Sequence, residues 1–223
     1  MKKILLLIVF SILLLLACTT TGKTAMKTRN VFYAGGDNGV KVALLKAGYT
    51  LVDDFDKTEV FVLNGEIPNA NAVASKLQNG SGLVLIVGEE MSFRDVEILF
   101  DYPVSALIKT ENLVNLVVDE SSGNDPLTTE IDWKDAPQIR ERAFIMTSAR
   151  GRPMVRVDGN VEVFLGEIGR TAEKKYVLDA FLDEKHNVQF QEWKYFDYLI
   201  YHLVERAAGA KPMNFADYSA QMH

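Results

Sequence analysis

The sequence is poor in residues that build disulfides and metal sites: 223 residues contain one cysteine, Cys18, and three histidines. A single cysteine excludes an intrachain disulfide and a thiolate metal site. His186, His202 and His223 lack the spacing of metal ligands, so no zinc site is predicted. A formal net charge of −6 without a basic run argues against a nucleic-acid partner. No cofactor is predicted.

One long hydrophobic run is present, over Ile4–Ala17, and two lysines precede it. It is shorter than the roughly 20 residues that a membrane-spanning helix needs. A basic start before a short apolar stretch is typical of a secretory signal peptide. The end of the run, Leu15-Leu16-Ala17-Cys18, resembles the lipobox of bacterial lipoproteins, in which the cysteine carries lipid and becomes the new N-terminus. We therefore expect a signal peptide over residues 1–17 and a flexible tether over residues 18–28.

The lipobox resemblance implies a lipid-anchored protein of the bacterial cell envelope. Acyl chains such as palmitate on Cys18 would hold the protein to the membrane, because each buried CH₂ contributes about 0.8 kcal/mol. Thr19 differs from the aspartate that retains some lipoproteins in the inner membrane, which favours the outer membrane and its periplasmic or surface side. Such a location also implies a protein partner in the envelope.

The segment Glu59–Glu90 organises the rest of the chain. Val60–Leu63 and Leu83–Val87 are short apolar runs, typical of strands that are buried on both faces of a parallel sheet. Between them, Pro68-Asn69 opens a helix and Asn79-Gly80 closes it. Because parallel strands require such a crossover, this segment predicts a strand–helix–strand unit.

The flanking segments extend this unit into one α/β domain over residues 29–223. We expect strands at 30–34, 49–52, 104–108, 113–118, 144–147, 154–157, 161–165 and 176–181, and helices ending near 47 and 100 and from Phe190 to Ala207. Asp158-Gly159 predicts a hairpin turn. The predicted fold is a mostly parallel central sheet with helices on both faces, plus a hairpin-rich segment near residues 139–181.

A family resemblance rests on several short segments in a fixed order. They are Ala47-Gly48-Tyr49, Thr58–Asn64, Asn79–Gly88, Asp125-Pro126-Leu127, Ile131-Asp132-Trp133 and Glu192–Phe196. Together they resemble the class I glutamine amidotransferase-like superfamily, which has a flavodoxin-like α/β fold. In catalytic members a cysteine follows the strand that corresponds to Leu83–Val87. Here the turn reads Gly88-Glu89-Glu90-Met91, so the resemblance implies a domain that kept the fold and lost the chemistry.

Polar residues follow the predicted strands at the carboxyl edge of the sheet, where ligands meet such folds. The candidate ligand-binding residues are Gly36, Asp37, Asn64, Glu66, Glu89 and Glu90. Clustered carboxylates suit a hard cation such as Mg²⁺ or Ca²⁺, or a shared proton in acid–base catalysis. In the simpler interpretation, Asp37 caps a helix, Glu89 and Glu90 favour a helix N-terminus, and Glu66 is solvated.

Two functions follow from the sequence. The first is a non-catalytic domain that binds a partner protein or a small ligand, with no catalytic residue assigned. The alternative is a hydrolase, metal- or carboxylate-dependent, that uses Glu66 and Glu89. Separately, strand alternation places Arg140 and Arg142 on one face, as a basic patch for an acidic partner or, more simply, as a solvated face.

Overall fold

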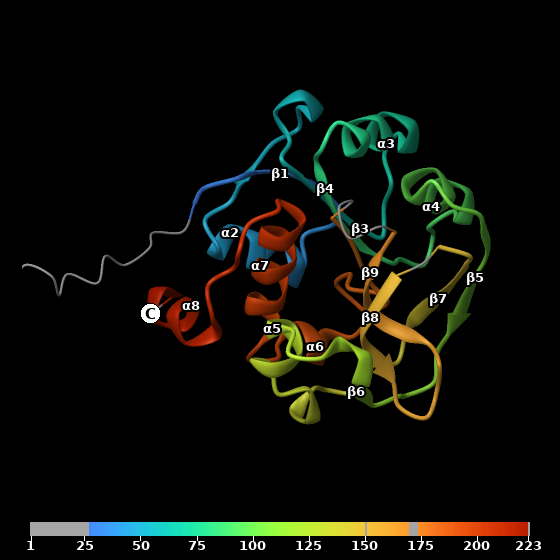
Figure 1. The fold of residues 1–223 in the computed structure, drawn as a ribbon, viewed down its shortest axis with the longest axis vertical. Helices are drawn as coiled ribbons and strands as arrows, with labels where there is room; N and C mark the ends of the chain where they lie inside the picture. Colours follow the sequence, from blue (N-terminus) through green and yellow to red (C-terminus); the bar gives the residue numbers. More distant parts are fainter. Residues whose placement is uncertain (1–26, 150, 170–173, 223) are drawn as a thin grey trace, which may run out of the picture.

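An eight-stranded mixed sheet forms the centre of the domain, with strand order β2-β1-β3-β4-β10-β9-β8-β6 (Figure 1). The computed structural model describes residues 27–149, 151–169 and 174–222. Neighbouring strands from β2 to β10 run parallel, and those from β10 to β6 run antiparallel. The predicted α/β architecture is therefore observed, with a parallel part and an antiparallel part that meet at β10.

The parallel part matches the strand positions that the sequence predicts. It comprises β1 (Asn30–Ala34), β2 (Thr50–Leu51), β3 (Val60–Asn64), β4 (Gly82–Ile86) and β10 (Lys175–Leu178). Side chains alternate between the faces of β3: Val60 and Val62 pack into one hydrophobic cluster, and Phe61 and Leu63 pack into another. This double burial explains why the strand is apolar from Val60 to Leu63.

Helices cover both faces of the sheet, as predicted (Figure 1). On one face lie α2 (Gly39–Lys46), α6 (Val188–Gln191) and α7 (Phe196–Ala207). On the other lie α3 (Ala70–Gln78) and α4 (Phe93–Phe100). Asn38 begins α2 because its side-chain oxygen accepts hydrogen bonds from the backbone N–H groups of Val40 and Lys41.

The single C-terminal helix that the sequence predicts is divided into α6 and α7. In the connecting turn, the N–H of Trp193 bonds to the carbonyl of Phe190, and the N–H of Phe196 bonds to the carbonyl of Trp193. These bonds span three residues, so the aromatic side chains keep helical spacing although the α-helix is interrupted. A further helix, α8 (Phe215–Met222), was not predicted.

The antiparallel part contains the predicted hairpin. It comprises β8 (Gly151–Val157), β9 (Val163–Ile168) and β6 (Leu116–Val118), while β5 (Val104–Thr110) and β7 (Arg142–Thr147) form a separate two-stranded sheet. Gly159 has φ of +70° in the turn between β8 and β9, a conformation that glycine adopts without strain. The loop expected to be irregular contains a short helix, α5 (Pro126–Thr129), and three-residue turns.

Two buried ion pairs tie distant segments together. Arg29 donates to both carboxylate oxygens of Glu205 on α7 at 2.7 Å, and Arg142 on β7 donates to Glu162 at 2.5 Å. The solvated face predicted for Arg140 and Arg142 is therefore wrong for Arg142, whose guanidinium also donates to the carbonyl of Asn112. Partners from other segments make its burial possible, and sequence alternation alone does not identify them.

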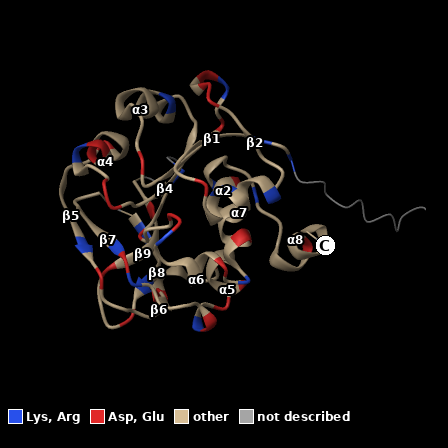
Figure 2. Cartoon of the chain, turned by 180° about the vertical axis from the view of Figure 1, so that it is seen from behind, with Lys and Arg blue, Asp and Glu red and all other residues tan. Residues whose placement is uncertain are grey.

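Lys and Arg are interspersed with Asp and Glu over several elements (Figure 2). Within the described ranges, no helix is both long enough and apolar enough to cross a membrane. The signal peptide over residues 1–17, Cys18 and all but the last two residues of the tether lie outside the described part.

Candidate functional site

A cleft of about 230 Å³ lies at the carboxyl ends of the parallel strands. It is lined by Gly36, Asn38, Asn64, Gly65, Glu66, Gly88, Glu89, Glu90, Phe181, Leu182 and Asp183. Asn64 is the last residue of β3, and the other residues follow β1, β3, β4 or β10, so four strands contribute to one edge. The topology rule for parallel sheets thus brings together residues that are far apart in the sequence.

Two glycines bring the loops after β3 and β4 into backbone contact. A Cβ atom on Gly88 would lie 2.2 Å from the Cα of Gly65, which no real side chain tolerates. Gly65 itself has φ of +78°. Only glycine pairs allow so close an approach, and the contact fixes the spacing between Glu66 and Glu89.

A partly buried polar network forms one wall of the cleft. The hydroxyl of Tyr33 lies 3.0 Å from the carbonyl of Gly36 and 3.0 Å from the side-chain oxygen of Asn38. The amide of Asn64 donates to this hydroxyl and, at 2.9 Å, to the carbonyl of Leu182. Burial is the main cause of a raised pKa at Tyr33, so the phenol stays neutral and keeps its proton for the network.

Asn38, a member of this wall, has a buried side-chain donor without a partner among the described residues. Its side-chain oxygen is occupied as the cap of α2, which determines that the amide nitrogen faces the other way. Asn38 is 8% exposed, and its Nδ2 atom has no hydrogen-bond partner among the described residues. A buried donor without an acceptor is costly, and this one belongs to a residue that lines the cleft.

Every charged residue that lines the cleft is acidic. Glu66, Glu89 and Glu90 are exposed to solvent, whereas Asp183 lies 2.6 Å from the imidazole of His186. Hydrogen bonds from His186 and from the backbone, together with the His186 charge, outweigh burial and hold the pKa of Asp183 below its usual range. A neighbouring hollow also lined by Glu66 and Glu90 adds Asp95, so the acidic surface continues beyond the cleft.

The structure brings together Gly36, Asn64, Glu66, Glu89 and Glu90 of the six residues predicted for ligand binding. The sixth residue, Asp37, does not line the cleft: it is exposed, and its carboxylate pairs with Lys41 one helical turn away. Helix capping, the simpler role considered for Asp37, belongs to Asn38. The sequence pattern could not separate these two neighbours, because the choice depends on which side chain points at the N–H groups of α2.

Sequence reasoning also missed the contribution of the segment after β10. Phe181, Leu182 and Asp183 reach the cleft because β10 pairs with β4 in parallel, although about 90 residues separate the two strands in the chain. Among residues 27–149, 151–169 and 174–222, no group of three His, Cys, Asp or Glu side chains is placed to hold a metal ion.

Comparison with known proteins identifies relatives of the fold only. The chain matches no family model and no curated protein sequence. The cytoplasmic protein STM1381 from Salmonella typhimurium LT2 superposes with a TM-score of 0.60 at 11% identity, over 81% of this chain and 99% of that one. The cytoplasmic protein STM3548 from Salmonella typhimurium gives 0.56 at 13% identity, over 77% and 95%. SMU.1228c gives 0.50 at 8% identity, over 82% and 99%.

These comparisons correct two predictions from the sequence. STM1381 and STM3548 are described as cytoplasmic proteins, which conflicts with a lipoprotein anchored through Cys18 in the outer membrane of the cell envelope. That prediction rested on a short apolar pattern before the domain, and the comparisons overturn it. The assignment to the class I glutamine amidotransferase-like superfamily is also withdrawn, since no family model supports it and unrelated proteins share α/β folds.

Proposed function

We propose that this domain is a non-catalytic binding module whose carboxyl-edge cleft holds a small cation that also carries a neutral hydrogen-bond acceptor. The cation pairs with the carboxylates of Glu66, Glu89 and Glu90. The acceptor, a carbonyl or hydroxyl oxygen, takes the hydrogen bond that Asn38 Nδ2 does not make with any described residue. The unpartnered amide of Asn38 is the observation that carries this proposal.

The acidic lining supports the positive charge of the ligand. Clefts lined by charges of one sign focus the electric field and raise the local concentration of oppositely charged molecules. No lysine or arginine is among the residues that line this cleft, and Lys41 nearby is already paired with Asp37. A cation therefore meets uncompensated carboxylates, whereas an anion meets only repulsion.

The binding role agrees with the residues at the turn after β4. Gly88-Glu89-Glu90-Met91 offers no thiol or hydroxyl that a covalent mechanism would need as a nucleophile. The site instead consists of close glycine backbones, a neutral tyrosine network and solvated carboxylates. These features orient and attract a ligand, and none of them activates a bond.

The proposal is tested with matched probes on the full chain. We would titrate β-alaninamide, which has one ammonium and one amide, against n-butylamine, which lacks the acceptor, and propanamide, which lacks the charge. Two-dimensional amide NMR reports binding through shifts near Asn38, Gly65 and Gly88. We expect β-alaninamide to bind at least tenfold more tightly than either fragment, because one hydrogen bond to a buried donor is worth about 1.4 kcal/mol.

A matched variant isolates the donor. Asn38→Asp keeps the oxygen that caps α2 and removes the Nδ2 hydrogens, so the fold is retained while the amide preference disappears. Glu89→Gln weakens the binding of β-alaninamide and of butylamine alike, since both probes carry a positively charged ammonium group. Equal affinities of all three probes for the wild-type chain would show that the cleft is not selective in this way and would reject the proposed function.

A further inference from the structure

A cavity of about 700 Å³, here called the basic cavity, is lined by residues of β8, β9, β10 and α7 and by residues next to β10 and α7. The charged and aromatic residues of its described lining are Arg152, Glu167, Lys174, Tyr176 and Arg206. The other described lining residues are glycines and one alanine, so little side-chain volume fills the space. None of these residues lines the carboxyl-edge cleft, so the basic cavity is a separate site.

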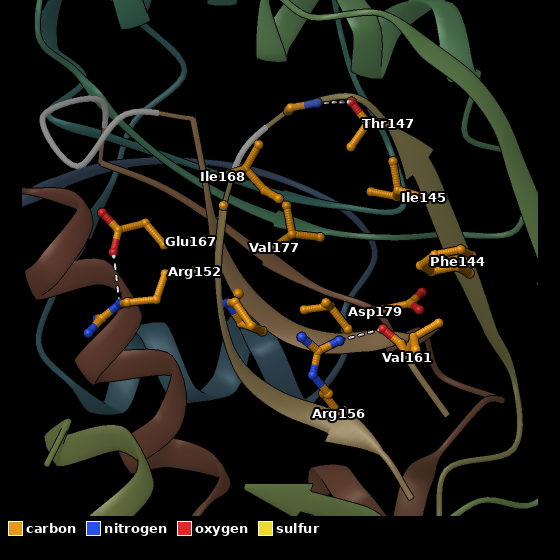
Figure 3. A pocket seen from close by; sticks show the side chains of 15 residues that line it. Phe144, Ile145, Thr147, Arg152, Arg156, Val161, Glu167, Ile168, Val177 and Asp179 are labelled. Atoms are coloured by element: carbon orange, nitrogen blue, oxygen red, sulfur yellow. Dashed lines mark hydrogen bonds and ion pairs between the residues drawn. The ribbon is translucent and has the colours of Figure 1, made fainter. Parts of the chain in front are cut away.

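Three of the lining side chains stand in one row across the sheet. Glu167 on β9 pairs in register with Arg152 on β8 and with Tyr176 on β10, and directly paired residues point to the same face of a sheet. Figure 3 shows the side chains of Arg152 and Glu167 pointing toward each other. From α7, Arg206 lies over the ring of Tyr176 with its guanidinium carbon 5.4 Å from the ring centroid, and it interacts with this side chain. The row therefore faces α7.

Asp125 holds both guanidinium groups from behind the cavity. Nη1 of Arg206 donates to both of its carboxylate oxygens, at 2.7 and 2.9 Å, and Nη2 of Arg152 donates to one of them. An arginine carries five N–H donors, so these contacts leave further donors on each guanidinium group. The side chain of Arg152 is 40% exposed and that of Arg206 is 18% exposed, so both groups remain accessible from the cavity they line.

Lys174 supplies a positive charge that no carboxylate balances. Its ammonium group forms no hydrogen bond or ion pair with a described residue. Gly209 leaves room for this group, because a Cβ atom at Gly209 would lie 2.6 Å from Nζ of Lys174. Among the described lining residues and their ion-pair partners, three cations thus meet two carboxylates, those of Glu167 and Asp125. One positive charge is left for a ligand.

We propose that the basic cavity binds the phosphate group of a small phosphorylated molecule. The ammonium group of Lys174 supplies the unmatched charge, and the guanidinium groups of Arg152 and Arg206 supply directed N–H donors. Charge-assisted hydrogen bonds of this kind are about twice as strong as neutral ones. A phosphomonoester offers three acceptor oxygens, one for each cation, whereas a carboxylate offers two. The volume lies in the range of roughly 300–1,000 Å³ that small-molecule sites occupy.

The test compares methyl phosphate with acetate and methylammonium on the full chain at constant ionic strength, because salt screens such contacts. Amide NMR reports binding through shifts of Arg152, Glu167, Tyr176 and Gly209. We expect methyl phosphate to bind about tenfold more tightly than acetate, the equivalent of one further hydrogen bond to a charged group, and methylammonium not to shift these amides. The carboxyl-edge cleft has its own reporters, so the outcome there does not affect this test.

A pair of lysine variants isolates the charge in the cavity. Lys174→Gln should weaken methyl phosphate at least tenfold, because it removes the ammonium group. Lys109→Gln, at an exposed lysine of β5 outside the cavity, changes the net charge equally and should leave binding unchanged. Lys174→Arg keeps the charge and should retain most of the affinity.

Arg152→Gln provides a second test if Lys174→Gln does not fold. Asp125 keeps its contacts with Arg206 in this variant, and methyl phosphate should again bind more weakly. Equal affinities of methyl phosphate and acetate for the wild-type chain would overturn the proposal. So would an equal effect of Lys174→Gln and Lys109→Gln, since Lys174 would then only balance the carbonyl end of α7 or the overall charge.

Discussion

Two hollows of this domain hold carboxyl groups in opposite environments. In the carboxyl-edge cleft of the parallel part, Glu66, Glu89 and Glu90 are exposed and surrounded by water. In the antiparallel part, a cavity of about 270 Å³ is lined by residues of β7, β8 and β9 and by residues in and after β10. Asp179, one of these residues, is buried beside the ion pair of Glu162 and Arg142. Solvated carboxylates attract a charge at little cost to the fold, whereas burial makes the ionised form of Asp179 costly and raises its pKa well above the usual range.

This contrast has a topological origin. A parallel sheet collects loops at one edge, where polar residues meet solvent. In the antiparallel part, residues of β7 from the two-stranded sheet and of β8, β9 and β10 from the eight-stranded sheet line one cavity. The same segment after β10 serves both hollows, since Asp179 faces the cavity and Asp183 faces the cleft.

The largest loss of stability is expected from breaking the buried ion pair between Arg142 and Glu162. Arg142→Met leaves Glu162 buried without its partner, and such changes cost about 3–5 kcal/mol in the free energy of unfolding. Urea denaturation followed by circular dichroism measures this loss. In the parallel part, Arg29→Met provides the matched comparison, because Arg29 pairs with the equally buried Glu205.

The double variant Arg142→Met with Glu162→Gln tests the cause. Removing the second charge as well should recover a large part of the lost stability, since no uncompensated ion is then buried. If the single variant loses less than about 1 kcal/mol, the range of an exposed pair, Glu162 is solvated in solution and the pair is not buried as the structure places it.

A smaller loss of stability is expected from a substitution at Gly88, which lines the cleft. Gly88→Ala places a methyl group 2.2 Å from the Cα of Gly65, so the two loops must separate. Overpacking of this kind costs about 1–3 kcal/mol, and thermal unfolding measures it. Gly36→Ala is the control, because no heavy atom lies within 4 Å of the added Cβ atom and the same cleft is involved.

The Gly88→Ala variant should also bind β-alaninamide more weakly, because Glu66 and Glu89 move apart. A variant as stable as the wild type would mean that the loops after β3 and β4 are not held in contact in solution.

The raised pKa of Asp179 makes the stability of the fold depend on pH. Its pKa in the folded chain is raised well above 3.8, so above pH 3.8 the folded state holds a proton that the unfolded state has released. Stability therefore falls as pH rises from about 3.9 toward the folded pKa. Asp179→Asn removes this dependence, and its amide can donate to Glu162, so the variant should gain stability over the wild type between pH 4 and 7.

Urea midpoints measured across this range check the sign. A difference between variant and wild type that does not change with pH would show that Asp179 titrates near its ordinary value in the folded chain. Glu162 and Arg142 are the charged groups that act on Asp179.

The sequence predicted the parallel part far better than the antiparallel part. The runs Val60–Leu63 and Leu83–Ile86 are apolar, and the helix between these two strands is bounded by Asn69 and Asn79-Gly80, so local patterns determine both strands and the helix. The cleft residues at the ends of β1, β3 and β4 could be predicted for the same reason, whereas those after β10 could not. Local patterns could not place Asp179 or Arg142, since their environment is made by Ala143, Glu162 and Asn112 through long-range pairing.

The smallest effect on stability and on ligand affinity is expected from substituting Asp37. This neighbour of Asn38 is one of the residues that the sequence predicts for ligand binding. Asp37→Asn should change neither the melting temperature nor the affinity for β-alaninamide, because its exposed pair with Lys41 is screened by solvent and its side chain does not line the cleft. Asn38→Asp at the next position should abolish the amide preference. If Asp37→Asn weakened binding as much as Asn38→Asp, the cleft would recognise charge at the start of α2, and the unpartnered amide of Asn38 would not be the group that selects the ligand.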